Sequence, residues 1–296
     1  FSQALQLSRA SKMKRLFLYI MMAAAFSACG HRASTADGTK ADSTSVGESQ
    51  DSIANADEPD VTVETIKYEK SDSTAEVSLL IQWPTEGSQP LVDSLRHHIS
   101  ELLSSNIDSP KAIEAYGNSL FESLSEDWHR VYDEMGEDGR GGAFTDNYDI
   151  TVLCETDCFI TYHYHHFTYG GGAHGYTTEV GFTFRKGDGK QIPLLTNTHS
   201  PMLAKLIKEG VRSFFSDGAE KPFTDEELLE YLFAEEVSAL NNIPLPGNAP
   251  YLSKTGVVFL YTQYEIAPYS SGIITFEIPF DKIRPFLTDE AKTLLP

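Results

Sequence analysis

The chain has 296 residues, of which 41% are hydrophobic and 22% charged, and its formal net charge at pH 7 is −20. Nucleic acids and anionic membrane surfaces repel a chain of this charge, which excludes partners of those kinds, whereas a basic protein would be attracted. The length is sufficient for one large domain or two closely packed domains.

The first 29 residues have the plan of a lipoprotein signal peptide. Two basic residues follow Met13, and an apolar run of about eleven residues then ends at Phe26. This run is too short to span a bilayer, which needs roughly 20 residues. Small residues precede Cys29, as in the bacterial lipobox. We predict that residues 1–28 are upstream sequence and signal peptide, and that lipid on Cys29 anchors the protein to a membrane. An ordinary secretory signal with a chance cysteine is the alternative.

Residues 29–58 are predicted to form a disordered, acidic, Ser-rich tether, because Ile53 is their only large aliphatic residue. Residues 1–28 hold four basic residues and no acidic one, so the mature chain would carry a net charge of −24. Gly30 is not the kind of residue that retains a lipoprotein in the inner membrane. We therefore expect an outer-membrane location in the cell envelope, on either its periplasmic or its surface face.

The first folded segment is predicted to be a hairpin followed by two helices. Apolar residues alternate from Ala75 to Trp83, which indicates a half-buried strand, and residues 61–70 form its partner, with a bulge where their apolar phase shifts. Pro90 and Pro110 suit the first turns of the two helices. The buried stripe of the second helix is predicted to be Ile113, Tyr116, Leu120, Leu124, Trp128 and Val131.

A second group of strands is predicted between residues 147 and 195, where "YDITVLC" and "CFITYHYHHF" both alternate. Cys154 and Cys158 stand on either side of a three-residue connection between the first two of these strands. An oxidising envelope permits a disulfide there, and we predict that facing cysteines in this hairpin form one, with a modest effect on stability. Two free, half-buried thiols are the alternative.

Helices are predicted after Ser200 and after Thr224, which forms a capping box with Glu227, and two further strands and a short helix complete the chain. Strands and helices come in separate blocks, and short connections join most neighbouring strands. We therefore predict an α+β fold with largely antiparallel sheets and helices packed on them.

The segment "FTYGGGAHGY" raises the question of chemistry. A phosphate-binding loop needs a helix after its glycines, and a strand pattern follows here. His163 and His165 share one strand face and His174 follows a short loop, so the three could hold zinc. No carboxylate stands at a familiar spacing to them, and the sequence contains neither HExxH nor G-x-S-x-G. We predict no catalytic residue, no cofactor and no enzymatic activity.

Two motifs carry a family resemblance: "YGGGAHG" at residues 169–175 and "YEIAPYSSG" at residues 264–272. Together they resemble the extracytoplasmic domain of RsiV-type anti-sigma factors and the related module of PdaC-type peptidoglycan deacetylases, over roughly residues 60–290. The resemblance implies an α+β fold in two intimately associated subdomains. Residues 60–165 would resemble the deacetylase module, and residues 166–290 the anti-sigma-factor domain. The motif residues are Gly170, Gly171, Gly172, His174, Gly175, Tyr264, Glu265, Pro268, Tyr269 and Gly272.

The resemblance implies binding and no catalysis, because the C-terminal domain of those anti-sigma factors is a lysozyme-binding sensor. We expect neither a sigma-binding segment nor a deacetylase domain here, so that the module stands alone on a lipid tether. The expected partner is lysozyme or another basic envelope protein. The alternatives are an envelope enzyme or glycan-processing accessory with a histidine metal site, and a purely structural lipoprotein.

The motif residues also lead to a physical expectation about packing. Consecutive glycines permit backbone angles that a Cβ atom forbids, and Pro268 breaks the strand that contains Glu265. A carboxylate in an otherwise apolar segment needs a polar partner. We expect the two loops to pack together, with His174 hydrogen-bonded to Glu265 or to a backbone carbonyl.

Overall fold

The structure is a computed structural model that describes residues 60–133, 141–233 and 243–295. The signal peptide, Cys29 and the tether lie outside these residues. No helix in the described ranges has the length and apolar character needed to cross a membrane.

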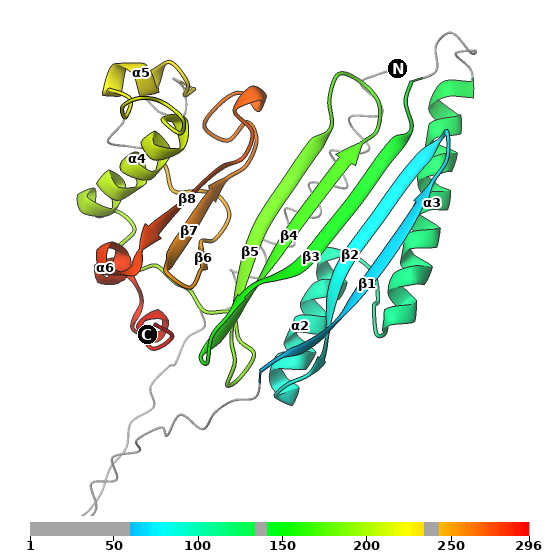
Figure 1. Cartoon of the computed structure of the whole chain (residues 1–296), viewed down its shortest axis with the longest axis horizontal. Helices are drawn as coiled ribbons and strands as arrows, with labels where there is room; N and C mark the ends of the chain where they lie inside the picture. The colour runs from blue at the N-terminus through cyan, green and yellow to red at the C-terminus, as the bar shows by residue number, and fades with distance from the viewer. Residues whose placement is uncertain (1–59, 134–140, 234–242, 296) are drawn as a thin grey trace, which may run out of the picture. The chain divides into compact units, whose positions relative to one another are not determined.

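A five-stranded sheet forms the first half of the fold (Figure 1). Its strands lie in the order of the chain: β1 (Thr62–Ser71), β2 (Ala75–Glu86), β3 (Phe144–Glu155), β4 (Phe159–Tyr169) and β5 (Tyr176–Arg185). The β1–β2, β3–β4 and β4–β5 pairs are antiparallel, whereas β2 and β3 are parallel. The parallel pair requires a long crossover, which two helices provide.

The predicted hairpin of β1 and β2 is confirmed. Its turn is held by Asp72, whose carboxylate accepts hydrogen bonds from the backbone N–H groups of Thr74 at 2.7 Å and Ala75 at 3.0 Å. The bulge predicted between Val63 and Ile66 is absent, because the register is continuous from Val63 to Ser71; the pair shifts register between Thr62 and Val63 instead, where the extra residue, Thr85, belongs to β2. Alternation along β2 therefore places its apolar residues on one face, as Ile81 and Trp83 show by being almost fully buried.

Helices α2 (Gln89–Leu102) and α3 (Pro110–Tyr132) cover that apolar face. Proline stands in the first turn of each, and Ser109 accepts a hydrogen bond from the N–H of Ala112. The buried stripe of α3 differs from the predicted one, because Gly117 and Phe121 replace Tyr116 and Leu120 as its centre. A Cβ atom at Gly117 would lie 2.5 Å from the Tyr68 ring, so glycine is what lets β1 approach this helix.

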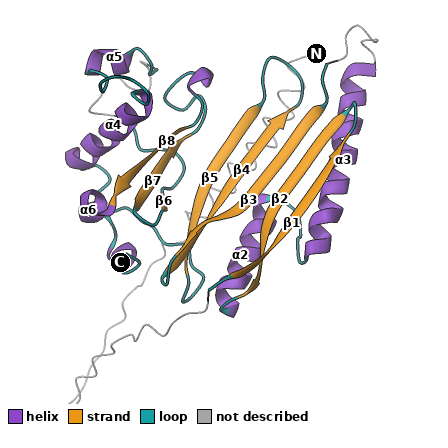
Figure 2. Cartoon of the chain, in the orientation of Figure 1, coloured by secondary structure: helices purple, strands orange, loops and turns teal. Residues whose placement is uncertain are grey.

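The second half contains a three-stranded antiparallel sheet and short helices (Figure 2). The strands are β6 (Tyr251–Leu252), β7 (Gly256–Tyr261) and β8 (Ile274–Pro279). The helices are α4 (Pro201–Phe215), α5 (Asp225–Leu229), α6 (Phe280–Ile283) and α7 (Asp289–Lys292), with 3₁₀ turns η4 (Tyr269–Ser271) and η5 (Arg284–Phe286). The predicted capping box of Thr224 and Glu227 is confirmed at α5.

These elements confirm an α+β fold with largely antiparallel sheets. The described residues form two hydrophobic clusters: one lies between the five-stranded sheet and α2 and α3, and the other is built mainly by residues 194–294. The five-stranded sheet continues to Arg185, so the predicted division between residues 165 and 166 falls inside β4.

Hydroxyl groups attach β6 to the five-stranded sheet. Thr161 of β4 donates to the carbonyl oxygen of Leu252 at 2.8 Å, and the N–H of Leu252 donates to the Thr183 hydroxyl of β5 at 2.9 Å. The ring of Tyr251 lies over Gly181, where a Cβ atom would collide with it. At this point the two sheets are thus joined by threonine hydroxyls and by the packing of Tyr251 on Gly181. They share no ladder of backbone hydrogen bonds here.

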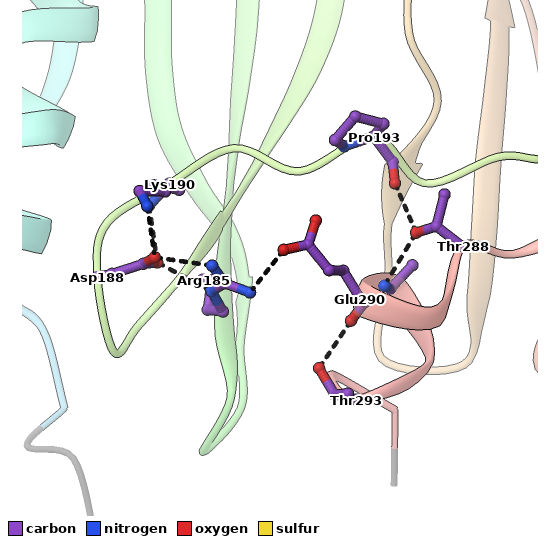
Figure 3. A network of polar contacts seen from close by, with 8 residues as sticks. Arg185, Asp188, Lys190, Pro193, Thr288, Glu290 and Thr293 are labelled. Carbon is purple, nitrogen blue, oxygen red and sulfur yellow. Dashed lines mark hydrogen bonds and ion pairs between the residues drawn. The ribbon is translucent and has the colours of Figure 1, made fainter. Parts of the chain in front are cut away.

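A polar network joins the end of β5 to α7 (Figure 3). The Arg185 guanidinium contacts Asp188 at 2.7 Å and Glu290 of α7 at 3.6 Å. The Thr288 hydroxyl, which caps α7, donates to the Pro193 carbonyl at 2.8 Å. The last helix is therefore held against the segment that leaves β5.

Candidate functional site

The two motif segments form loops that meet in the structure. The first loop, residues 170–175, connects β4 to β5, and the second, residues 262–273, connects β7 to β8 and contains η4. We refer to them as the paired loops. The expectation that they pack together is confirmed, because three side chains of the second loop contact the first loop or the strand after it.

Positive backbone φ angles shape the first loop. Gly171 has φ +86° and Gly172 has φ +96°, in the region that favours glycine. A Cβ atom at Gly171 would also lie 2.7 Å from the Tyr132 hydroxyl of α3. The loop joins two strands and no helix follows it, so these glycines serve a tight connection and the phosphate-binding interpretation has no support.

His174 is stacked between the loops. Its ring lies 3.8 Å from the ring of Tyr269 at an interplanar angle of 22°. Its Nδ1 lies 2.9 Å from the Gly175 carbonyl oxygen and its Nε2 lies 3.4 Å from the Tyr264 hydroxyl. A carbonyl only accepts, so Nδ1 carries a proton and donates it to the Gly175 carbonyl. The expected bond to a backbone carbonyl is therefore confirmed.

The expected bond between His174 and Glu265 is absent, because Glu265 has other partners. Its carboxylate accepts from the backbone N–H of Thr262 at 2.7 Å and from that of Gly247 at 2.6 Å. The Thr262 hydroxyl donates to it as well, at 3.1 Å. Glu265 thus stabilises the turn that contains it. The backbone N–H groups, and not His174, are the hydrogen-bond donors to its half-buried carboxylate.

Tyr264 is the unusual residue of the second loop. Its φ is +68°, which is uncommon for a residue with a side chain, and 52% of its surface is exposed. Its ring lies 5.7 Å from that of Tyr269 and 6.4 Å from that of His174. Three aromatic rings are thus gathered here, those of Tyr264 and His174 exposed and that of Tyr269 partly buried, and the Tyr264 backbone is held in an unfavourable conformation.

Sequence reasoning missed one residue of this site. Gln263 accepts a hydrogen bond from the backbone N–H of Thr177 at 3.0 Å, which ties the second loop to the start of β5. A glutamine inside the apolar run "FLYTQYEI" was the available signal. The positive φ of the next residue, Tyr264, had no signal in the sequence.

His163 and His165 do share a sheet face, the one turned away from α2 and α3, but each lies beside a carboxylate of a neighbouring strand. His163 Nε2 is 2.9 Å from Glu179, and His165 Nδ1 is 3.9 Å from Asp149. His174 is held instead by the paired loops. Within the described ranges, no three His, Cys, Asp or Glu side chains are arranged to hold a metal ion, so the alternative zinc site of these histidines is not formed.

The predicted disulfide is also absent, because both Cys154 and Cys158 are free thiols. The strand register explains this: Cys154 lies opposite Thr161, just after a bulge in β3, whereas Cys158 belongs to the turn before β4. The two cysteines therefore do not face each other as a disulfide requires. Burial raises the pKa of the Cys154 thiol above its ordinary value.

Comparisons with known proteins agree with this architecture. Residues 198–281 match the family described as "Protein of unknown function (DUF3298)". A crystal structure of a DUF3298 family member from Bacteroides fragilis is similar to the chain, with a TM-score of 0.62 and 18% identity, and the similarity covers 77% of this chain and 94% of that one. A DUF3298 family protein from Pseudomonas aeruginosa is also similar, with a TM-score of 0.52 and 14% identity, over 81% of this chain and 98% of that one. At these identities the likeness establishes the fold alone. No curated protein matches the sequence significantly.

Proposed function

We propose that this chain is a non-catalytic binding module of the bacterial cell envelope, lipid-anchored through Cys29, and that the paired loops contact a basic protein partner. Lysozyme is the partner that the resemblance to RsiV-type anti-sigma factors suggests. The same proposal includes that the chain is RsiV-like, that it is located at the outer membrane and that it is attached to a membrane.

One observation carries the proposal: Tyr264 holds a half-exposed ring outward on a backbone with φ +68°. Such a conformation costs free energy, and strained residues of this kind concentrate at functional sites. Tyrosine is enriched among the residues that dominate protein interfaces. A strained, exposed tyrosine beside two other rings is what a binding surface needs and what a purely structural loop does not.

The chemistry of the loops suits a cationic partner. Lysine and arginine side chains are attracted to the faces of aromatic rings, and Tyr264 and Tyr269 offer two such rings. The net charge of −20 would add long-range attraction that speeds the encounter with a basic protein and weakens with salt.

The test is a titration of the full chain with purified lysozyme at low and at moderate salt. We expect saturable binding that weakens as salt rises, and loss of most of it in Tyr264→Ala. Tyr231→Ala is the matched control, because Tyr231 is 44% exposed but lies outside the paired loops. Cytochrome c, another basic protein, separates specific binding from general charge attraction.

Absence of binding at tens of micromolar lysozyme would remove lysozyme as the partner. Equal binding of lysozyme and cytochrome c, unaffected by Tyr264→Ala, would remove the paired loops from the interaction and leave only the acidic surface.

A further inference from the structure

The outer edge of β8 is unpaired. β8 pairs with β7 on one side, and it is the last strand of its sheet. Throughout the described part of the chain, no residue is hydrogen-bonded to the backbone groups of Ile274–Ile278 that β7 leaves free. A row of free N–H and C=O groups is a template for another extended segment.

One outer strand of the five-stranded sheet, β1, is protected in ways that β8 is not. The β1–β2 ladder shifts register between Thr62 and Val63, and β1 carries two lysines, Lys67 and Lys70, the second with its ammonium 4.2 Å above the Phe121 ring. Lysines and bulges are the usual means of preventing edge pairing. β8 contains neither, and Glu277 is its only charged residue.

A shallow cavity of about 430 Å³ lies beside β8. Three consecutive β8 residues line it, and Tyr251, Val258 and Glu277 form a row across the sheet on this side. The cavity is lined by Leu153, Cys154, Tyr251, Ser253, Lys254, Val258, Thr275, Phe276 and Glu277. A strand added beyond β8 would place alternate side chains on the face that carries Thr275 and Glu277, within reach of this mainly apolar space.

Glu277 adds a charge preference to the edge. Its carboxylate accepts from the Ser253 hydroxyl at 2.6 Å and from the Thr255 hydroxyl at 2.7 Å, which fixes its position. No lysine or arginine of the described ranges forms an ion pair with it. A positively charged side chain on an incoming strand would therefore find an ordered and unpaired carboxylate.

We propose that the β8 edge binds an extended segment of a partner protein, which adds a strand to the sheet. Main-chain hydrogen bonds provide the affinity, an apolar side chain enters the cavity, and a lysine or arginine lies beside Glu277. This surface is separate from the paired loops, so its success or failure does not depend on the lysozyme titration. α4 packs on β8 through Gly210 and Phe276. A second copy of the chain would bring its own α4 to the β8 edge and need space for it, whereas a short extended segment would not.

The test uses a synthetic heptapeptide, Lys-Thr-Val-Thr-Val-Thr-Lys, whose lysines and valines share one strand face, and the full chain. Amide hydrogen exchange is measured with and without peptide. We expect exchange at the free β8 amides to slow by at least about tenfold at saturation, with no change in β1. A peptide with proline in place of its central threonine has the same charge and lacks an N–H for pairing, and it should give no protection.

A pair of protein variants tests the same edge. Thr275→Lys places a cation at the β8 edge and should weaken peptide binding by at least about tenfold. Thr65→Lys is the matched control, because it makes the same change on β1 and should leave binding unchanged. Protection that is absent, that appears in β1, or that survives Thr275→Lys would overturn the proposal. Concentration-dependent dimerisation of the peptide-free chain that Thr275→Lys abolishes would also overturn it, by assigning the edge to a second copy.

Discussion

Tyr269 and Gly175 are joined by a 2.9 Å hydrogen bond across 94 positions of sequence. The Tyr269 hydroxyl donates to the Gly175 carbonyl, which also accepts from Nδ1 of His174. One carbonyl thus receives a donor from each of the paired loops, while the Tyr269 ring stacks on the histidine. The contact between the motifs is therefore a specific hydrogen-bonded arrangement, and its parts can be removed one at a time.

Tyr269→Phe removes the hydroxyl and keeps the ring. We expect the free energy of unfolding to fall by about 0.5–1.5 kcal/mol, the usual net value of one hydrogen bond, because His174 still satisfies the carbonyl. Urea denaturation measures the change. Tyr231→Phe is the control, since the structure gives the Tyr231 hydroxyl no hydrogen bond within the described ranges. An equal loss in both variants would contradict the assigned role of the bond.

Tyr264→Gly should separate binding from stability. Glycine adopts φ +68° without the cost of about 1–2 kcal/mol that a side chain incurs there, although it loses more backbone entropy on folding. We expect the free energy of unfolding to be unchanged or higher by up to about 1 kcal/mol, while binding of the basic partner weakens.

Tyr264→Val is the matched comparison for this position, because a β-branched residue tolerates positive φ poorly. It should be clearly less stable than Tyr264→Gly in the same urea experiment. A Tyr264→Gly variant that unfolds as easily as Tyr264→Val would show that the ring contacts, and not the backbone angle, govern the stability of this loop.

Lys186 is buried, and its ammonium bridges Glu155 at 2.9 Å and Asp60 at 3.1 Å. Burial opposes its charge, but the hydrogen bonds that the ammonium donates to the two carboxylates prevail and raise the pKa of Lys186 above its ordinary value. Both carboxylates retain access to solvent, so we expect Lys186→Met to lower the free energy of unfolding by about 1–3 kcal/mol, less than a fully buried pair would lose.

Lys190→Met is the control for this prediction, because Lys190 contacts Asp188 at 3.5 Å but is 71% exposed. It should cost less than about 1 kcal/mol. Thermal or urea unfolding of both variants decides the comparison, and a cost for Lys186→Met no larger than that of the control would refute the structural role of the buried ammonium.

Asp188 should make stability depend on pH in the acid range. The hydrogen bond from Arg185 lowers the pKa of Asp188 to about 2, below its ordinary value of about 3.9. Because the folded state has the lower pKa, the carboxylate contributes its full stabilisation above about pH 4 and loses it as the pH falls from about 4 to about 2. The difference in unfolding free energy between the natural chain and Asp188→Asn should shrink over that interval.

The Arg185→Met background provides the internal check, since the guanidinium causes the shift. In that background, Asp188→Asn should have an effect that depends much less on pH. Urea midpoints at several pH values from 5 to 2 measure both differences, and a difference that stays constant with pH in the natural background would contradict the assignment.

Most strands and helices could be predicted from local patterns, for physical reasons that particular residues illustrate. Alternation from Ala75 to Trp83 reflects a strand with one buried face, and Ser109 and Pro110 mark a helix start. The stripe of α3 was misplaced because Gly117 has no side chain to count as apolar, although the Tyr68 ring packs on it. The parallel pairing of β2 and β3 depends on where a two-helix crossover returns the chain, which no local pattern specifies.

The candidate site was predictable only in part. The meeting of the two loops followed from their motifs, but the partner of Glu265 did not, because Gly247 lies 18 residues away in an irregular segment. The cysteines show a similar limit: their spacing fits a hairpin, and the bulge at Val152 and Cys154 changes which residue each one faces. Register and backbone angle therefore decided the details that residue type left open.

The existence of two hydrophobic clusters bears on how such a sequence can change over time. Substitutions in one cluster need no compensating repacking in the other, since distant sites without shared partners act independently. Each half can then accumulate changes at its own pace, provided that the hydroxyls of Thr161 and Thr183 and the ion pair of Arg185 keep the halves attached.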